Sequence, residues 1–137
     1  MKIAFCLDDD NGLLFNGRRL SRDSAVINDL IDSLPPGEKL RILPFSLTLF
    51  RGLEDRVSVC DSIDGAGTDE LCFVESIDAS AYTEYISTLT VYRWNRRYPS
   101  DMKLTMSLEH FRLISQTDFP GSSHERITKE VYIPCVN

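Results

Sequence analysis

A nearly continuous apolar run opens the chain and constrains its fold more than any other feature. Residues 2–7 read Lys-Ile-Ala-Phe-Cys-Leu, without the alternation of apolar and polar residues that a half-exposed strand shows. A strand of this kind is typical of a sheet that is covered on both faces. The sequence therefore predicts a first strand at residues 2–7 within an α/β sheet that carries helices on both sides.

Helix-like and strand-like segments alternate after this run. A helix is predicted over residues 25–34, where apolar residues recur at three- and four-residue spacing, with Asp23 or Ser21 as its N-cap. Short helices are predicted after Pro44 and at residues 82–89. Further strands are predicted at residues 39–43, 57–60, 71–75 and 90–94. Such alternation favours parallel pairing of the strands.

The last third of the chain has a different pattern. Residues 104–106, 111–116 and 127–133 alternate apolar and polar side chains, which is typical of antiparallel strands. We therefore predict a three-layer α/β/α fold with a mixed, mainly parallel sheet and an antiparallel C-terminal part. A chain of 137 residues fits a single domain, residues 1–137.

Charge and composition narrow the classes of partner. The net charge of −6 argues against binding of duplex nucleic acid, which depends on neutralising phosphates. No apolar run approaches the roughly 20 residues that span a bilayer, and no signal region opens the chain. We predict a cytoplasmic protein that does not bind membranes. The cysteines show no C-x-x-C spacing, so reduced thiols and no metal site are expected.

A basic segment precedes the predicted helix. It carries Arg18, Arg19 and Arg22 and ends at Asp23. A local excess of arginine in an acidic protein favours an anionic ligand, so these three residues are candidate ligand-binding residues. Asp23 is a candidate catalytic carboxylate beside this segment. The alternative is that Asp23 acts only as the helix cap, a role that aspartate commonly takes.

A second group of arginines lies among aromatic residues between Tyr92 and Asp101. One interpretation is a surface on which Arg96 and Arg97 bind a nucleotide or an acidic partner by stacking and bidentate contacts. The other is a strand whose aromatic side chains enter the core while its arginines face solvent. Arg96 and Arg97 are therefore candidate ligand-binding residues.

Two polar clusters have competing interpretations. His124, within Gly121–Glu125, is a candidate catalytic residue because imidazole changes charge near neutral pH. The alternative is a turn in which Ser122 or Ser123 bonds its own backbone. Residues 8–10 are three aspartates, which cannot all face one Mg²⁺ ion from an extended strand. We expect a solvated turn there, with one aspartate paired to an arginine of the same loop.

The order of these elements resembles that of dihydrofolate reductase. Asn11-Gly12-Leu13-Leu14 after the first strand is similar to the mobile loop that covers the active site in that family. Asp23 falls near the family's substrate-binding carboxylate. Residues 86–119 are similar to a helix end, a strand, a loop and a W-x-x-x-S-x-x-x-F strand, with Phe111 in the tryptophan's place. The resemblance implies that Asn11, Gly12 and Ile27 lie beside a substrate cleft.

The departures from that family concern the cofactor. Glu75-Ser76 stands where the family has a Gly-Gly pair beside the NADPH pyrophosphate, and residues 43–48 lack its basic Gly-Arg-x-Thr. Arg19-Leu20-Ser21 replaces its Leu-Pro-Trp. The middle of the chain is also shorter than in that family, by about one helix-strand unit. A bulky acidic residue hinders the approach of phosphate, so NADPH is not expected as a cofactor.

These observations together predict a shortened dihydrofolate reductase-like domain without ordinary NADPH-dependent reductase activity. It would bind an anionic small molecule or nucleotide in the former substrate cleft; if it is an enzyme, it is an oxidoreductase of the dihydrofolate reductase type. Two alternatives remain open: a protein-interaction, immunity or regulatory module that uses the Tyr92–Tyr98 surface, and a reductase with an atypical nicotinamide site.

A second resemblance is rejected because the chain lacks the metal ligands that it implies. The runs YRWNR, GSSHE and ITKEVY are similar to short bacterial proteins sometimes labelled ribonuclease Z. That label implies an H-x-H-x-D-H cluster that holds two zinc ions. This chain contains only His110 and His124, so it cannot supply those ligands.

Overall fold

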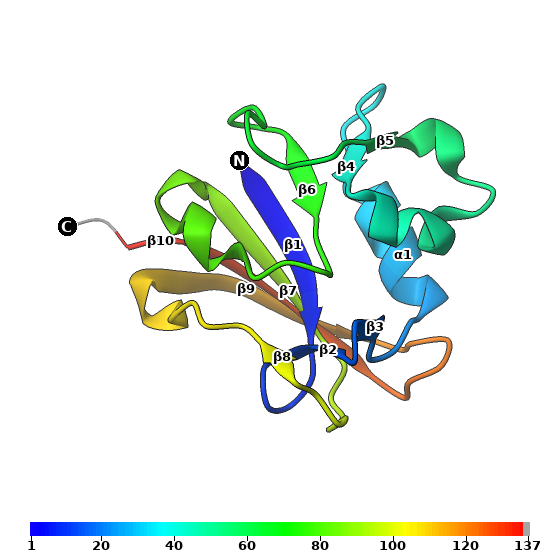
Figure 1. Ribbon diagram of the computed structural model, residues 1–137, viewed down its shortest axis with the longest axis vertical. Helices are drawn as coiled ribbons and strands as arrows, with labels where there is room; N and C mark the ends of the chain where they lie inside the picture. The colour runs from blue at the N-terminus through cyan, green and yellow to red at the C-terminus, as the bar shows by residue number, and fades with distance from the viewer. Residues whose placement is uncertain (136–137) are drawn as a thin grey trace.

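A seven-stranded sheet forms the centre of the computed structural model, which describes residues 1–135 (Figure 1). Its strands lie in the order β5-β4-β6-β1-β7-β10-β9. Their bounds are Lys2–Leu7 (β1), Leu40–Ile42 (β4), Val57–Val59 (β5), Leu71–Phe73 (β6), Thr88–Arg93 (β7), Phe111–Phe119 (β9) and Ile127–Pro134 (β10). The first five strands in that order are parallel, while β10 pairs antiparallel with both β7 and β9. The predicted mixed, mainly parallel sheet is therefore confirmed.

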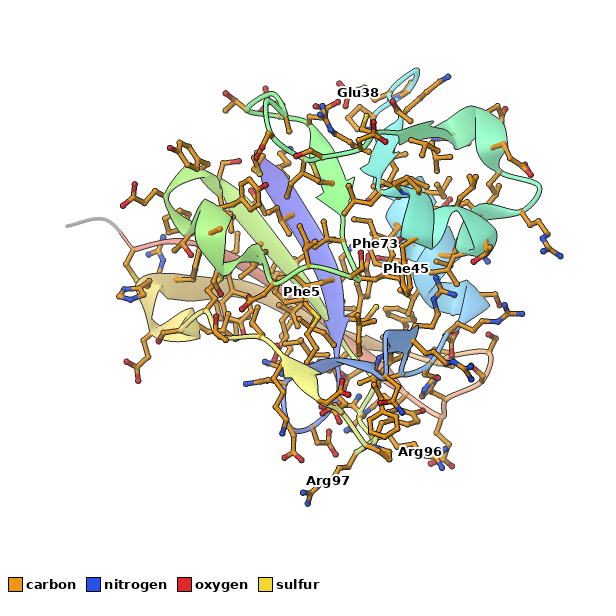
Figure 2. All side chains as sticks on the ribbon, in the orientation of Figure 1. Phe5, Glu38, Phe45, Phe73, Arg96 and Arg97 are labelled. Carbon is orange, nitrogen blue, oxygen red and sulfur yellow. The ribbon has the colours of Figure 1, made fainter. Side chains whose placement is uncertain are left out.

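Both faces of the sheet are buried at its central strand β1, which explains the apolar opening of the sequence. Ile3 and Phe5 of β1 belong to one core cluster, whereas Ala4 between them belongs to a second cluster. Because neighbouring side chains of a strand point to opposite faces, these two clusters lie on opposite sides of β1. Phe5 and Phe73, one from each cluster, both lie in the interior (Figure 2).

One α-helix is described, and it covers one of these two faces. Helix α1 spans Ser24–Asp32 and contributes Val26 and Leu30 to the same cluster as Ala4. The helix begins at Asp23, whose extended backbone and side chain cap it by accepting a hydrogen bond from Ala25 N at 2.9 Å. The predicted helix is confirmed, with Asp23 rather than Ser21 as its cap.

The two other predicted helices, after Pro44 and at residues 82–89, are short 3-10 segments, and two further 3-10 segments were not predicted. They are η1 (Pro44–Phe50), η2 (Glu54–Arg56), η3 (Ala79–Tyr85) and η4 (Leu108–His110). The predicted helix at residues 82–89 is wrong at its end, because Thr88 already begins β7. Ala79 and Tyr82 of η3 pack against the cluster that contains Phe5. This layer is therefore built from 3-10 turns, which seldom extend beyond a few residues.

A small second sheet corrects two predictions. It is antiparallel and consists of β3 (Arg18–Arg19), β2 (Gly12–Phe15) and β8 (Met102–Lys103). The segment expected to be a mobile loop, Asn11–Leu14, is thus largely a paired strand. The strand predicted at residues 104–106 lies instead at β8. Leu104 and Met106 fill the core from irregular backbone, so their apolar character does not reflect a strand.

Candidate functional site

The Asp23 carboxylate is the most heavily bonded polar group of the predicted site. Its Oδ1 accepts hydrogen bonds from Ala25 N at 2.9 Å, from Ser122 N at 2.8 Å and from Ser122 Oγ at 2.9 Å. Its Oδ2 accepts from Ser123 N at 2.9 Å and lies 2.9 Å from His124 Nδ1. The side chain has no exposed surface. Both oxygens are therefore occupied by groups of the protein.

These contacts determine the charge of Asp23. Burial by itself would raise the pKa of the carboxyl, since it disfavours the ionised form. The N–H groups of residues 122 and 123, together with the His124 ring, outweigh burial and hold that pKa well below its ordinary value. Asp23 is thus a buried carboxylate that is ionised at neutral pH.

Gly121 allows the loop to approach this carboxylate. A β-carbon at residue 121 would lie 2.5 Å from Asp23 Oδ2 and 2.7 Å from the carbonyl oxygen of His124. Only glycine fits such distances without a shift of the backbone. The expected turn, in which Ser122 or Ser123 bonds its own backbone, is wrong: both serines bond to a carboxylate about 100 residues away in the sequence.

His124 lies between Asp23 and two hydroxyl groups. Its Nε2 is 2.9 Å from Tyr98 Oη and 3.2 Å from Ser21 Oγ. Its ring stacks on Trp94, with 4.7 Å between centroids and 19° between planes. Asp23 and His124 were predicted as separate site residues, and the fold brings them into contact. Ser21 was considered only as a helix cap, although a two-residue spacing from Asp23 puts both side chains on one side of an extended segment.

A second network spans the carboxyl ends of β4 and β6. Arg19 Nε donates to Glu75 Oε1 at 2.9 Å, and Arg19 Nη2 donates to Glu75 Oε2 at 3.0 Å. Ser46 Oγ donates to the same Oε2 at 2.7 Å, and the guanidinium lies over the Phe45 ring at 4.8 Å. In open α/β sheets this edge is where ligands commonly bind. Here the side chains of the protein itself bridge it, near the labelled Phe45 (Figure 2).

A cavity of about 270 Å³ lies between the start of α1 and η1. Its lining residues are Arg22, Asp23, Ser24, Ile27, Thr48, Leu49 and Arg51. Arg22 and Ile27 were predicted as ligand-binding residues. Arg51 was not predicted, because no motif in the neighbouring sequence indicates a ligand-binding role. Asp23 is the only acid in this lining, and its oxygens are already occupied.

No protein-family model matches the sequence, and no curated protein matches it. Solved structures do. The dihydrofolate reductase from Enterococcus faecalis, complexed with NADP(H) and RAB-propyl, matches with a TM-score of 0.67. The match covers 99% of this chain and 97% of that chain, at 7% sequence identity. The fold is dihydrofolate reductase-like. At this identity the likeness concerns the fold alone.

Within this dihydrofolate reductase-like fold, the predicted loop residues contact the protein itself. Asn11 Oδ1 accepts a hydrogen bond from Arg93 Nη1 at 2.8 Å. Gly12 N donates to Asp8 Oδ1 at 2.6 Å, and a β-carbon at residue 12 would lie 2.6 Å from Ser100 Oγ. Arg18 is exposed on β3. Asn11 and Gly12 are therefore held by contacts within the protein, and Arg18 is exposed to solvent, whereas Arg19 is bonded to Glu75.

The aspartates after β1 stabilise this loop. Asp8 is completely buried, and its carboxylate accepts hydrogen bonds from the backbone of Asp10 and Gly12 and from Tyr98 N at 2.9 Å. The expected solvated turn is wrong for Asp8. Asp10 is paired with Arg97 at 2.8 Å, an arginine from a distant loop rather than from its own. Residues 1–135 contain no cluster of three or more side chains suited to a metal ion.

Of the two interpretations of residues 92–101, the structure confirms the one with buried aromatic side chains and exposed Arg96 and Arg97. Tyr92 is 1% exposed and Trp94 is 5% exposed, because β7 lies inside the sheet with both faces covered. Tyr92 Oη donates to Asp29 Oδ2 at 2.6 Å. Arg96 and Arg97 project at the edge of the molecule (Figure 2). An interaction module that presents Tyr92 and Trp94 as a hot spot is therefore wrong.

Two further findings concern the remaining predictions. The four cysteines, all within the described range, are free. Within residues 1–135, no helix is long and apolar enough to cross a bilayer.

Proposed function

We propose that this protein binds a small anionic molecule in the cavity between α1 and η1, and that it lacks ordinary NADPH-dependent reductase activity. The observation that carries the proposal is the pair of arginines at this cavity. Arg22 and Arg51 both line it and are both exposed, and neither forms an ion pair with any residue from 1 to 135. Unpaired guanidinium groups favour a carboxylate or phosphate.

The rest of the lining indicates the size and shape of the ligand. Ser24 and Thr48 offer hydroxyl groups, and Ile27 and Leu49 offer apolar surface. The volume of about 270 Å³ is slightly below the usual range of ligand cavities, about 300 to 1,000 Å³. A single ring or short chain with one or two negative groups fits these features. A nucleotide would extend beyond the cavity into solvent.

Two features argue against reductase chemistry of the usual kind. The Arg19–Glu75 pair bridges the crevice at the carboxyl ends of β4 and β6, where a dinucleotide would otherwise have access. The only acid in the cavity, Asp23, is held ionised by protein donors and has no exposed side-chain surface. Such a carboxylate is poorly placed to give a proton to a substrate.

Ligand binding is tested by isothermal titration with benzoate, folate, AMP and inorganic phosphate. We expect saturable binding of at least one carboxylate or phosphate compound, with a loss of at least tenfold in affinity in Arg22→Ala and in Arg51→Ala. Arg112→Ala is the matched control, since it removes the same charge from exposed strand β9. The absence of binding by every compound, or equal binding by Arg51→Ala and wild type, would refute the proposal.

The second half of the proposal is tested with NADPH. We expect no saturable change in NADPH fluorescence and no oxidation of NADPH with dihydrofolate. Turnover of NADPH would instead favour a reductase with an atypical nicotinamide site. Glu75→Gly tests whether the Arg19–Glu75 pair is what keeps NADPH out of the crevice. If it is, this variant binds NADPH more tightly than wild type.

A further inference from the structure

Ser21 and Asp23 lie on opposite sides of one imidazole ring. Asp23 has an extended backbone, with φ of −153° and ψ of 123°. Along extended chain, residues two apart point to the same side with a separation of about 7 Å. The His124 ring enters this gap from the loop at residues 121–124, with Nδ1 at 2.9 Å from Asp23 Oδ2 and Nε2 at 3.2 Å from Ser21 Oγ. Arg22, between them, lines the cavity beside α1 instead.

The three side chains are buried to different degrees. The Asp23 side chain is wholly covered, that of His124 is 4% exposed, and Ser21 is partly exposed. An ionised carboxylate at Nδ1 favours the tautomer with its proton there, which leaves Nε2 free to accept a proton from a hydroxyl. Stacking on Trp94 holds the plane of the ring. This arrangement has the order hydroxyl, base and orienting carboxylate that activates a serine.

We propose that Ser21 is a nucleophile, with His124 as its general base and Asp23 as the positioning carboxylate, and that this site hydrolyses small carboxylic esters. This site shares Asp23 with the lining of the cavity between α1 and η1, whereas Ser21 and His124 lie outside that lining. A second cavity of about 650 Å³ lies beside His124; Arg96, Arg126 and Glu125 line it, and Ser21 lies outside its lining. With two arginines against one glutamate, the lining has a net positive charge and favours an ester that carries a negative charge.

The reaction follows from these positions. Ser21 Oγ attacks the ester carbonyl carbon while its proton passes to His124 Nε2. The bond to the alcohol oxygen then breaks, and the alcohol leaves with the proton from Nε2. Water attacks the acyl-serine in the same way, giving the free acid and restoring Ser21. Arg22 N–H donates to no acceptor within residues 1–135, and it follows the nucleophile directly, as one donor to the oxyanion does in many serine hydrolases.

Tyr98 provides an internal test of this assignment. Its hydroxyl lies 2.9 Å from the same Nε2 atom and therefore competes with Ser21 for one lone pair. Tyr98→Phe removes the competitor and leaves the base to Ser21. A purely structural hydrogen bond between Ser21 and His124 would not make Ser21 more reactive in this variant.

The experiment is labelling of the folded protein with diisopropyl fluorophosphate and with p-nitrophenyl succinate, an anionic activated ester, followed by peptide mass spectrometry. We expect an adduct at Ser21, its loss in Ser21→Ala and in 6 M urea, and labelling at least threefold faster in Tyr98→Phe. Ser76→Ala, which removes another partly exposed serine, should label like wild type. The fluorescence of Trp94 confirms that each variant is folded. No adduct at Ser21, or no acceleration in Tyr98→Phe, would overturn the proposal.

Discussion

Gly121→Ala should weaken the protein by disturbing the loop around Asp23. The new β-carbon would lie 2.5 Å from Asp23 Oδ2 and 2.7 Å from the His124 carbonyl oxygen, which is closer than real contacts allow. Gly121 does not adopt a positive φ, so the effect is steric rather than conformational. Overpacking of this kind costs about 1–3 kcal/mol.

The loop cannot relieve this contact without a further loss. Moving away from Asp23 lengthens the hydrogen bonds from Ser122 N and Ser123 N, which are 2.8 and 2.9 Å. Hydrogen bonds to a charged group contribute about 1.5–3 kcal/mol each. We therefore expect the free energy of unfolding to fall by about 1–3 kcal/mol, since the loop should accept the smaller of the two penalties.

Urea denaturation followed by Trp94 fluorescence measures this change. Trp94 is the only tryptophan of the chain and stacks on His124, so its emission reports directly on the loop. Gly67→Ala is the matched control: Gly67 has no positive φ, and its nearest neighbour would lie 3.9 Å from the new carbon. We expect that variant to remain within about 0.5 kcal/mol of wild type. Equal stability of the two variants would refute the steric argument.

Three further predictions concern other contacts. Asp23→Asn should lower the free energy of unfolding by about 3 kcal/mol at pH 7. Because folding lowers the pKa of Asp23, the carboxylate stabilises the protein above its unfolded-state pKa of about 3.9, and this stabilisation is lost as the pH falls. The free energies of unfolding at pH 7 and pH 3 should therefore differ less in the variant than in wild type. Glu75→Gln leaves Arg19 without its ion-pair partner and should cost about 2 kcal/mol by urea denaturation. Tyr92→Phe removes the 2.6 Å hydrogen bond to Asp29 and should lower the free energy of unfolding by about 1–2 kcal/mol. A change below about 0.3 kcal/mol in Tyr92→Phe would contradict the assigned bond.

Local sequence patterns were sufficient for most of the central sheet. The continuous apolar runs at β1 and β6 arise because both faces of these strands are buried, and the repeat in α1 arises because one face packs on the sheet. The pattern could not distinguish 3-10 turns from α-helix at η3, since one or two turns contain too few repeats. It also missed β2, whose partner β8 lies about 90 residues away in the sequence.

The candidate site was predictable by residue type but not by arrangement. Asp23 and His124 were each predicted from their side-chain chemistry. Their contact could not be predicted, because the two residues are 101 positions apart in the sequence. The two interpretations of Tyr92 and Trp94 could not be separated from the sequence for a related reason. Both faces of β7 are covered, so the exposed arginines nearby gave no guide to the position of the aromatic side chains.

The position of Asp23 affects how any functional experiment on this protein has to be designed. One carboxylate caps α1, anchors the loop at residues 121–124 and orients His124. A change at Asp23 therefore alters stability, loop position and the imidazole together, and loss of function in such a variant would not identify a catalytic role. Arg51 and Ser21 are better probes, because Arg51 lines only the binding cavity and Ser21 contributes a single hydroxyl contact to His124. Each can be changed while the Asp23 network keeps its six donors.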